Sequence, residues 1–189
     1  MFGRRKKSSV VKWGLIGSAV AGGIALIPLV PALKKRAMRA TTILKKDHRV
    51  VSGLLATLEM TPKINGMVRR TLFNQIRQSL MIHAQVEEEI FYPAVRNLMF
   101  GGEGSKVDEA YREHQTVKDL LNQMVTMDAI SDEFDGKLAE LKKNIQHHVQ
   151  QEEGDMFPLV THRMSSERLE EIGQKMHERK IDLKTQMAA

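Results

Sequence analysis

The sequence contains no cysteine, and only 5% of its 189 residues are aromatic. The absence of cysteine excludes a disulfide scaffold, a thiolate-ligated zinc or iron–sulfur site, and a cysteine nucleophile. The sequence also lacks runs that alternate apolar and polar residues over a useful length, so β-strands receive little support. With 42% hydrophobic residues, the length suits one domain with an appendage.

The net charge of +6 is unevenly distributed along the chain. Residues 1–49 hold 12 of the 29 basic residues and a single acid, Asp47, which gives +11. The remaining 140 residues carry 17 bases against 22 acids, which gives −5. The main domain is therefore acidic, and we predict no nucleic-acid partner for it.

Residues 13–33 form an uncharged segment between two basic clusters. As a helix this segment would span roughly 31 Å, about one hydrocarbon core. We predict an apolar helix that associates the protein with a membrane, and the additional cations after it favour a cytoplasmic main domain. Two alternatives stay open. The segment is a cleaved secretory signal, or, given Pro28 and Pro31, a hairpin or homo-oligomerisation segment of a soluble cytoplasmic protein.

From about residue 39 the apolar residues recur at helical spacing in four long stripes. The stripes are Leu44–Leu58, Leu72–Ala94, Val107–Met124 and Phe134–Leu159, the last with Ser131 as its N-cap. A shorter helix that carries Leu169 and Leu183 is expected after them. The pattern predicts an all-α, up-down-up-down four-helix bundle with an N-terminal apolar helix and a short C-terminal helix. We expect an anchor at 1–37, the bundle at 38–164 and the C-terminal helix at 165–189.

Each predicted interior stripe contains at least one residue that can ligate a metal. His48 and His114 lie on the first and third stripes, and the second and fourth each carry a histidine followed four residues later by a glutamate: His83, Glu87, His148 and Glu152. The paired histidines are 35 and 34 residues apart, which indicates an internal repeat. Two helix pairs related by a pseudo-twofold axis would bring these six side chains around one point.

Taken alone, each histidine is more readily explained as an exposed or hydrogen-bonded residue, and each His-x-x-x-Glu pair as a surface interaction. The conjunction favours a metal site, because burying these groups without compensation would cost many kcal/mol. Imidazole and carboxylate ligands suit iron, manganese or zinc, and six ligands exceed the four that zinc usually takes. We therefore predict two metal ions, with Glu87 and Glu152 as bridges and two histidines completing each ion.

Two sequence elements, each present twice, carry a resemblance to a known family. Asp/Glu-His-x-x-Val-x-x-Leu-Leu and His-x-x-x-Glu-Glu-(x)4-Pro resemble the hemerythrin-like HHE cation-binding family over roughly residues 40–160. The resemblance implies a four-helix bundle with a non-haem di-iron centre ligated by His48, His83, Glu87, His114, His148 and Glu152. Oxygen-carrying hemerythrins have a further histidine where this sequence has Ala110, and they place the last acid at the position of Glu153. These departures argue against simple reversible oxygen carriage.

We accordingly predict a non-haem di-iron protein that binds, senses or reacts with dioxygen, nitric oxide or peroxide. Two iron ions are the expected cofactor, with manganese or zinc as weaker alternatives. The alternative function is an iron-binding regulatory or storage module without redox turnover, and a third interpretation is a structural bundle with an empty cluster. No catalytic residue is assigned, since nothing in the sequence indicates a substrate pocket. Tyr111, Glu153 and His147 are candidates for positions beside the metal, while His162 and His177 are expected at the surface.

Overall fold

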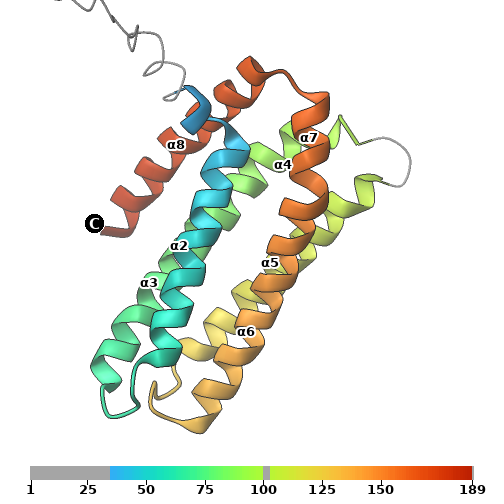
Figure 1. Ribbon diagram of the computed structural model, residues 1–189. Helices are drawn as coiled ribbons and strands as arrows, with labels where there is room; N and C mark the ends of the chain where they lie inside the picture. Colours follow the sequence, from blue (N-terminus) through green and yellow to red (C-terminus); the bar gives the residue numbers. More distant parts are fainter. Residues whose placement is uncertain (1–34, 100–102, 189) are drawn as a thin grey trace, which may run out of the picture.

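The computed structural model describes residues 35–99 and 103–188, and these ranges contain helices and no strand. Four long helical segments alternate in direction and form the predicted up-down-up-down bundle (Figure 1). The first segment is α2 (Ala40–Met60), and the second is α3 (Gly66–Val86) continued by the π-helical turn η1 (Glu87–Phe91) and α4 (Tyr92–Arg96). The third is α5 (Gly104–Val125), and the fourth is α6 (Asp132–Gln151) continued by the π-helical turn η3 (Glu152–Met156) and α7 (Phe157–Arg163).

Local sequence signals set the helix ends at one end of the bundle. Helix α2 stops before Thr61, whose backbone is extended, as expected for a residue that precedes a proline. Helix α6 starts at the predicted N-cap, because the Ser131 hydroxyl accepts a hydrogen bond from the Phe134 amide at 3.1 Å. Three acids in the first turn of α6 add favourable charge at the positive end of its dipole.

A buried arginine joins the two loops at this end. Arg69 is only 3% exposed, and its guanidinium donates to the carbonyl oxygens of Ala129 at 2.7 Å and Thr61 at 2.9 Å. It also pairs with Asp135 on α6. Because Thr61 lies in the α2–α3 loop and Ala129 in the α5–α6 loop, Arg69 fixes the two helical hairpins to each other.

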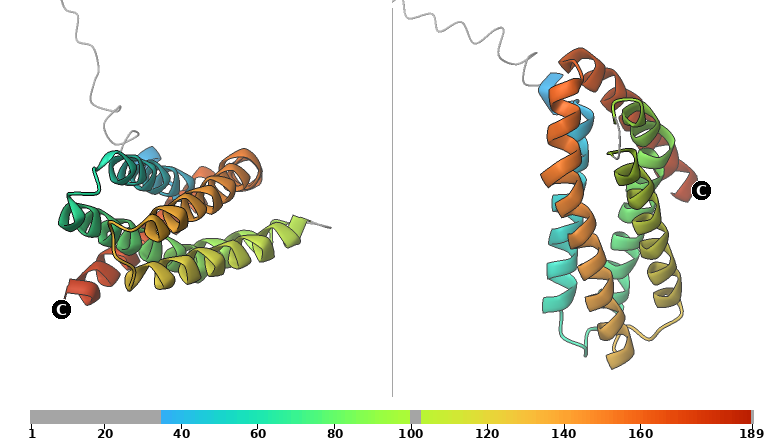
Figure 2. Two further views of the ribbon diagram at one scale, coloured as in Figure 1. Left: turned by 90° about the horizontal axis from the view of Figure 1, so that it is seen from below. Right: turned by 90° about the vertical axis from the view of Figure 1, so that its right-hand side faces the viewer.

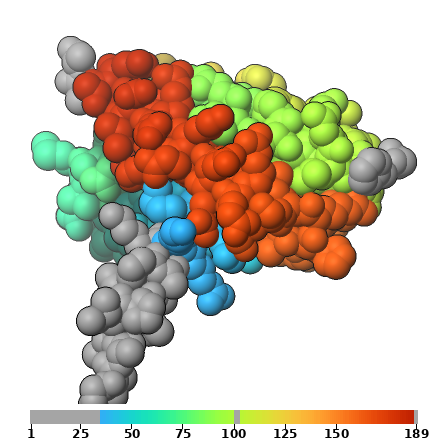
Figure 3. Space-filling model, turned by 90° about the horizontal axis from the view of Figure 1, so that it is seen from above, coloured from blue at the N-terminus to red at the C-terminus, as the bar shows by residue number. Residues whose placement is uncertain are grey.

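The C-terminal helix α8 (Ser166–Ala188) is present as predicted but is not short, because it has 23 residues. It lies outside the bundle and packs against α2 and α3 (Figure 2). Gly173 permits a close approach, since a Cβ at this position would lie 1.7 Å from the Met38 carbonyl oxygen. Seen from above, side chains of α7 and α8 cover much of the end of the bundle where α8 begins (Figure 3).

The core consists of two apolar clusters with a polar layer between them. One cluster lies toward the Arg69 end and includes Leu55, Phe73 and Phe134. The other includes Phe91 and Phe157 together with the apolar face of α8. Between them lie six residues that are no more than 5% exposed: His48, His83, Glu87, His114, His148 and Glu152.

The predicted membrane segment is outside this description. Residues 13–33 do not belong to the described residues. Among the helices that are described, none has the length and apolar character needed to span a membrane.

Candidate metal centre

The six residues singled out as ligands from the sequence meet in the middle of the bundle. His48 comes from α2, His83 from α3, His114 from α5 and His148 from α6, while Glu87 and Glu152 are the first residues of η1 and η3. Donor atoms of these residues form two overlapping groups of four in which all atoms lie within 4.8 Å of one another. The helical register derived from the sequence therefore places all six side chains together.

The four imidazoles are arranged as two pairs. The ring centroids are 4.9 Å apart for His48 and His83, and 4.7 Å apart for His114 and His148. Three centroid separations between the pairs are 6.2 to 6.3 Å. Each pair combines one histidine from each helix of a hairpin, as the internal repeat predicts.

Each central carboxylate contacts one histidine of each pair. Glu87 Oε2 lies 3.0 Å from His83 Nε2 and 3.2 Å from His114 Nε2. Glu152 Oε2 lies 3.4 Å from His48 Nε2 and 3.5 Å from His148 Nε2. Two carboxylates that each reach both pairs are arranged as bridges between two cations would be.

The π-helical turns orient the residues that follow the two glutamates. The Tyr92 amide bonds to the Glu87 carbonyl, and the Phe157 amide bonds to the Glu152 carbonyl, five residues back in both cases. A proline follows directly each time and has no amide hydrogen to continue the regular ladder. In a regular helix, residues five apart differ by about 140° in direction. The wider π turn instead brings Tyr92 and Phe157 toward the interior.

Tyr92 is fully buried and adds a hydroxyl to the centre. The hydroxyl donates to Glu152 Oε1 at 2.9 Å and lies 3.3 Å from His114 Nε2. Burial, followed by the charges of Glu87 and Glu152, raises the pKa of Tyr92 well above its usual value. At the equivalent position of the other half, Phe157 stacks against His48 with centroids 6.0 Å apart. Tyr92 was not identified from the sequence as part of the centre. Its hydroxyl makes the two halves of the centre chemically different, because Phe157 has none.

A second set of carboxylates faces the outer nitrogen of each imidazole. Because a carboxylate can only accept, the three contacts within hydrogen-bond distance place a hydrogen on Nδ1 of His48, His114 and His148 and leave Nε2 facing the centre. The Nδ1 to carboxylate distances are 2.8 Å for His48–Glu153, 3.0 Å for His114–Glu88 and 2.9 Å for His148–Glu113. The fourth carboxylate, Asp47, lies 3.6 Å from His83 Nδ1, which is too long for a hydrogen bond. The four acids, which we call the outer carboxylates, each adjoin a central residue in sequence.

Buried polar atoms at the centre lack hydrogen-bond partners. They are His48 Nε2, both ring nitrogens of His83, both carboxylate oxygens of Glu87 and Glu152 Oε2. Leaving a buried polar group unsatisfied costs on the order of 1–3 kcal/mol, and more when the group is charged. A bound cation would satisfy these nitrogen and oxygen atoms at once, so the donor set fits a metal.

Protons balance part of the charge when no metal is bound. Burial lowers the pKa of His83, but the charge of Glu87 and the nearby Asp47 outweigh it and raise this pKa to about 10. Burial likewise acts to raise the pKa of Glu87, but His83 and His114 hold it well below its usual value. His83 therefore carries a proton that a metal ion would displace.

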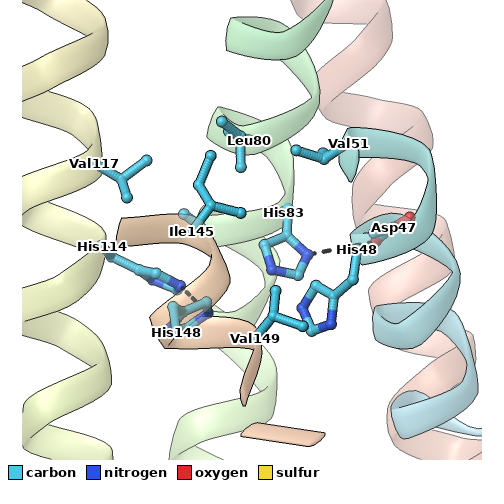
Figure 4. A pocket seen from close by; sticks show the side chains of 11 residues that line it. Asp47, His48, Val51, Leu80, His83, His114, Val117, Ile145, His148 and Val149 are labelled. Atoms are coloured by element: carbon cyan, nitrogen blue, oxygen red, sulfur yellow. Dashed lines mark hydrogen bonds and ion pairs between the residues drawn. The ribbon is translucent and has the colours of Figure 1, made fainter. Parts of the chain in front are cut away.

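A small cavity of about 20 Å³ adjoins the histidines on the side toward the Arg69 end (Figure 4). Its wall opposite the imidazoles is formed by the apolar side chains of Val51, Leu80, Val117 and Ile145, while Val149 lies among the histidines. This volume is close to that of one water-sized molecule. The cavity therefore offers a small, largely apolar space beside the donor atoms.

The remaining candidates lie farther from the centre. Glu153 holds His48, as described above, whereas the Tyr111 hydroxyl donates to the Glu88 carbonyl at 3.0 Å and does not line the cavity. His147 is 60% exposed and contacts Glu113. His162 and His177 are exposed, as expected. Asp47, Glu88 and Glu113 were not assigned a role from the sequence, although each adjoins a predicted ligand.

Comparison with known proteins places this site in context. Residues 39–160 match the family described as Hemerythrin HHE cation binding domain. The crystal structure of a hemerythrin HHE cation binding domain-containing protein of Mycobacterium kansasii is similar, with a TM-score of 0.68 and 26% identity. The similarity covers 78% of this chain and 88% of that one. The matched residues include all six at the centre.

Two relatives extend the comparison. An uncharacterized hemerythrin-like protein of Schizosaccharomyces pombe is 29% identical over 139 residues, which are 73% of this chain and 67% of the relative. A protein of Nostoc sp. named DNA nickase is 30% identical over 171 residues, or 90% of this chain. The chain spans only 45% of the length of the Nostoc protein.

Proposed function

The chain belongs to the hemerythrin HHE cation-binding family, and on this premise we propose that its buried cluster holds two non-haem iron ions. We further propose that these ions bind, sense or react with a small oxidant, namely dioxygen, nitric oxide or peroxide. The observation that carries the proposal is the contact of Glu87 and Glu152 with a histidine of each pair. Such carboxylates can neutralise and bridge two cations.

The proposed ligand roles follow the pairing of the imidazoles. His48 and His83 would complete one ion, and His114 and His148 the other. Six nitrogen and oxygen donors without a thiolate suit iron or manganese better than zinc, which usually takes four ligands. When bound, the iron pair supplies redox-active ions with open coordination positions for a small ligand.

The surrounding residues would control what reaches the iron. Three of the outer carboxylates accept a hydrogen bond from an imidazole Nδ1 and so fix its orientation, which raises the basicity of that imidazole toward the metal. The cavity has a largely apolar wall and a volume of about 20 Å³, which favours a small ligand over a bulky organic hydroperoxide. The cavity thus supports a small oxidant as the ligand.

Two side chains favour reaction or sensing over simple oxygen carriage. Ala110 is buried one turn before His114 and offers no donor where oxygen-carrying hemerythrins have a histidine. The Tyr92 hydroxyl instead supplies an oxygen 3.3 Å from His114 Nε2. The half of the centre that contains His114 therefore offers a phenolic oxygen, and it has one imidazole fewer than the corresponding half of oxygen-carrying hemerythrins.

Stopped-flow mixing of the reduced, iron-loaded protein with each oxidant tests the proposal. A rapid, stoichiometric change in the visible spectrum with dioxygen, nitric oxide or hydrogen peroxide is expected. A protein that holds two irons and reacts with none of them would favour the alternative, an iron-binding regulatory or storage module.

The location and partners of the protein are proposed on the sequence alone. We propose that residues 13–33 associate the bundle with a membrane or with a second copy of the chain. Liposome flotation and light scattering of the full chain and of residues 38–189 test this, and identical behaviour of both would contradict it. Although the Nostoc relative is named DNA nickase, we expect no nucleic-acid substrate here, because residues 50–189 carry 22 acids against 17 bases.

A further inference from the structure

The outer carboxylates differ in their cationic partners. Lysine ammonium groups accompany three of them, at 2.5 Å for Lys180–Asp47, 2.7 Å for Lys118–Glu88 and 3.9 Å for Lys45–Glu153. Within residues 35–99 and 103–188, no lysine or arginine pairs with the fourth, Glu113. Glu113 instead contacts His147 and His148. The charge of Glu113 is therefore compensated in a different way from that of the other three.

The surroundings of Glu113 are rich in acceptors. Its Oε2 accepts from His148 Nδ1 at 2.9 Å, while its Oε1 is buried without a hydrogen bond and lies 3.3 Å from His147 Nε2. One turn earlier on α5, Glu109 presents a second carboxylate to the same point. The Gln151 amide is the donor here, at 2.9 Å from His147 Nε2 and 3.3 Å from Glu109 Oε1.

The internal repeat shows that this cluster is particular to the second half of the chain. His147 precedes His148 as Ile82 precedes His83, and Gln151 precedes Glu152 as Val86 precedes Glu87. Ile82 and Val86 are fully or almost fully buried in the apolar cluster that contains the face of α8. In the second half, the two matching positions on α6 are the polar residues His147 and Gln151, and His147 is 60% exposed to solvent.

We propose that Glu109, Glu113 and His147 form a second, solvent-facing site for a divalent transition-metal ion, separate from the buried centre. Their three ligand atoms lie within 4.8 Å of one another, come from two adjacent helices and combine two carboxylates with an imidazole. This donor set suits zinc, ferrous iron or manganese, with water completing the coordination. An ion here would provide the positive charge that lysine provides at the other three outer carboxylates.

The site is linked to the centre by one side chain. Glu113 holds His148 Nδ1 with one oxygen and offers the other oxygen to the proposed ion. An ion at the surface site therefore draws electron density from the carboxylate that orients His148. The surface site stands on its own residues and does not require iron in the centre.

Equilibrium dialysis of the full-length, iron-loaded protein against micromolar Zn²⁺ tests this proposal, with zinc and iron counted per chain in the same sample. We expect one saturable zinc ion per chain in addition to the iron. His147→Ala and Glu109→Gln should each weaken this binding about tenfold or more and leave the iron count unchanged. His177→Ala, which removes an exposed histidine on α8, should change neither count.

Three results would overturn the proposal. They are the absence of additional zinc, zinc that merely replaces iron ion for ion, and additional zinc binding that both variants leave intact. A wild-type protein without iron would contradict the di-iron proposal instead. Even then, the surface site would be tested by comparing the zinc count of the wild type with that of His147→Ala, which should be one ion per chain lower.

Discussion

Replacing Glu87 with glutamine removes one negative charge from the middle of the centre and leaves the side-chain volume almost unchanged. Glu87 is fully buried, and its Oε2 contacts His83 at 3.0 Å and His114 at 3.2 Å, one histidine of each pair. A neutral amide is a poor ligand for iron and cannot neutralise two cations. We therefore expect Glu87→Gln to reduce the occupancy of both iron positions.

The loss of iron should appear as a loss of stability. An ion that binds only the folded state adds about 2.7 kcal/mol when its free concentration is 100 times its Kd. Two such ions add roughly 5 kcal/mol, which for a chain of this size corresponds to a Tm increase of roughly 10 to 20 °C. The iron-dependent part of the Tm should be small or absent in Glu87→Gln.

The assay is calorimetry of protein purified without oxygen, with and without iron, together with the iron count per chain. Glu89→Gln is the matched control, because Glu89 lies two residues away, is exposed and pairs with Arg179. The control should keep both the iron and the stabilisation. If Glu87→Gln kept two irons per chain and the full iron-dependent rise in Tm, the bridging role would be refuted.

Three further predictions follow from other contacts. Arg69→Leu leaves loop carbonyls unpaired and should lower the free energy of unfolding by roughly 3 kcal/mol in urea titrations; an unchanged value would contradict the role of Arg69 in joining the hairpins. Tyr92→Phe leaves Glu152 Oε1 without its donor, so the metal-free protein should lose about 1–3 kcal/mol, and equal stability would show that this hydrogen bond contributes nothing. Because the pKa of His83 is raised to about 10 and iron takes the unprotonated imidazole, iron binding should release protons and tighten as the pH rises from 7 to 8.5. Calorimetry in two buffers of different ionisation enthalpy measures that release, and a binding enthalpy that does not depend on the buffer would contradict it.

The central residues could be predicted from the sequence because they follow regular helical geometry. His83 and Glu87 continue the apolar stripe of Leu80 at three and seven residues, and His148 and Glu152 continue that of Ile145 in the same way. A straight helix keeps such positions on one face, so periodicity alone placed them inside the bundle. The repeat of the pattern in both halves then indicated that the side chains meet.

Tyr92 could not be found by the same reasoning. At 100° per residue it falls about 140° from Glu87, away from the stripe. Its inward position depends on the π-helical turn that precedes Pro93, and periodicity assumes a regular helix throughout. A proline lies ten residues after His83 and ten residues after His148, and it is the available signal in the sequence for an irregular turn at both sites.

The outer carboxylates and the length of α8 depend on tertiary packing. Glu88 and Glu113 adjoin the ligands but resemble ordinary solvated acids until two helices bring them to an imidazole on another segment. Helix α8 extends over 23 residues because its apolar face is buried against the bundle, whereas helix propensity alone gives a weak estimate of length.

The most direct test of the di-iron proposal is the metal content and the near-ultraviolet and visible spectrum of protein purified without oxygen, recorded before and after air is admitted. The proposal predicts about two iron ions per chain, as the two pairs of histidines indicate, and new absorption after exposure to air. A colourless protein with one zinc ion, or with no metal, would contradict it and leave only the helical bundle.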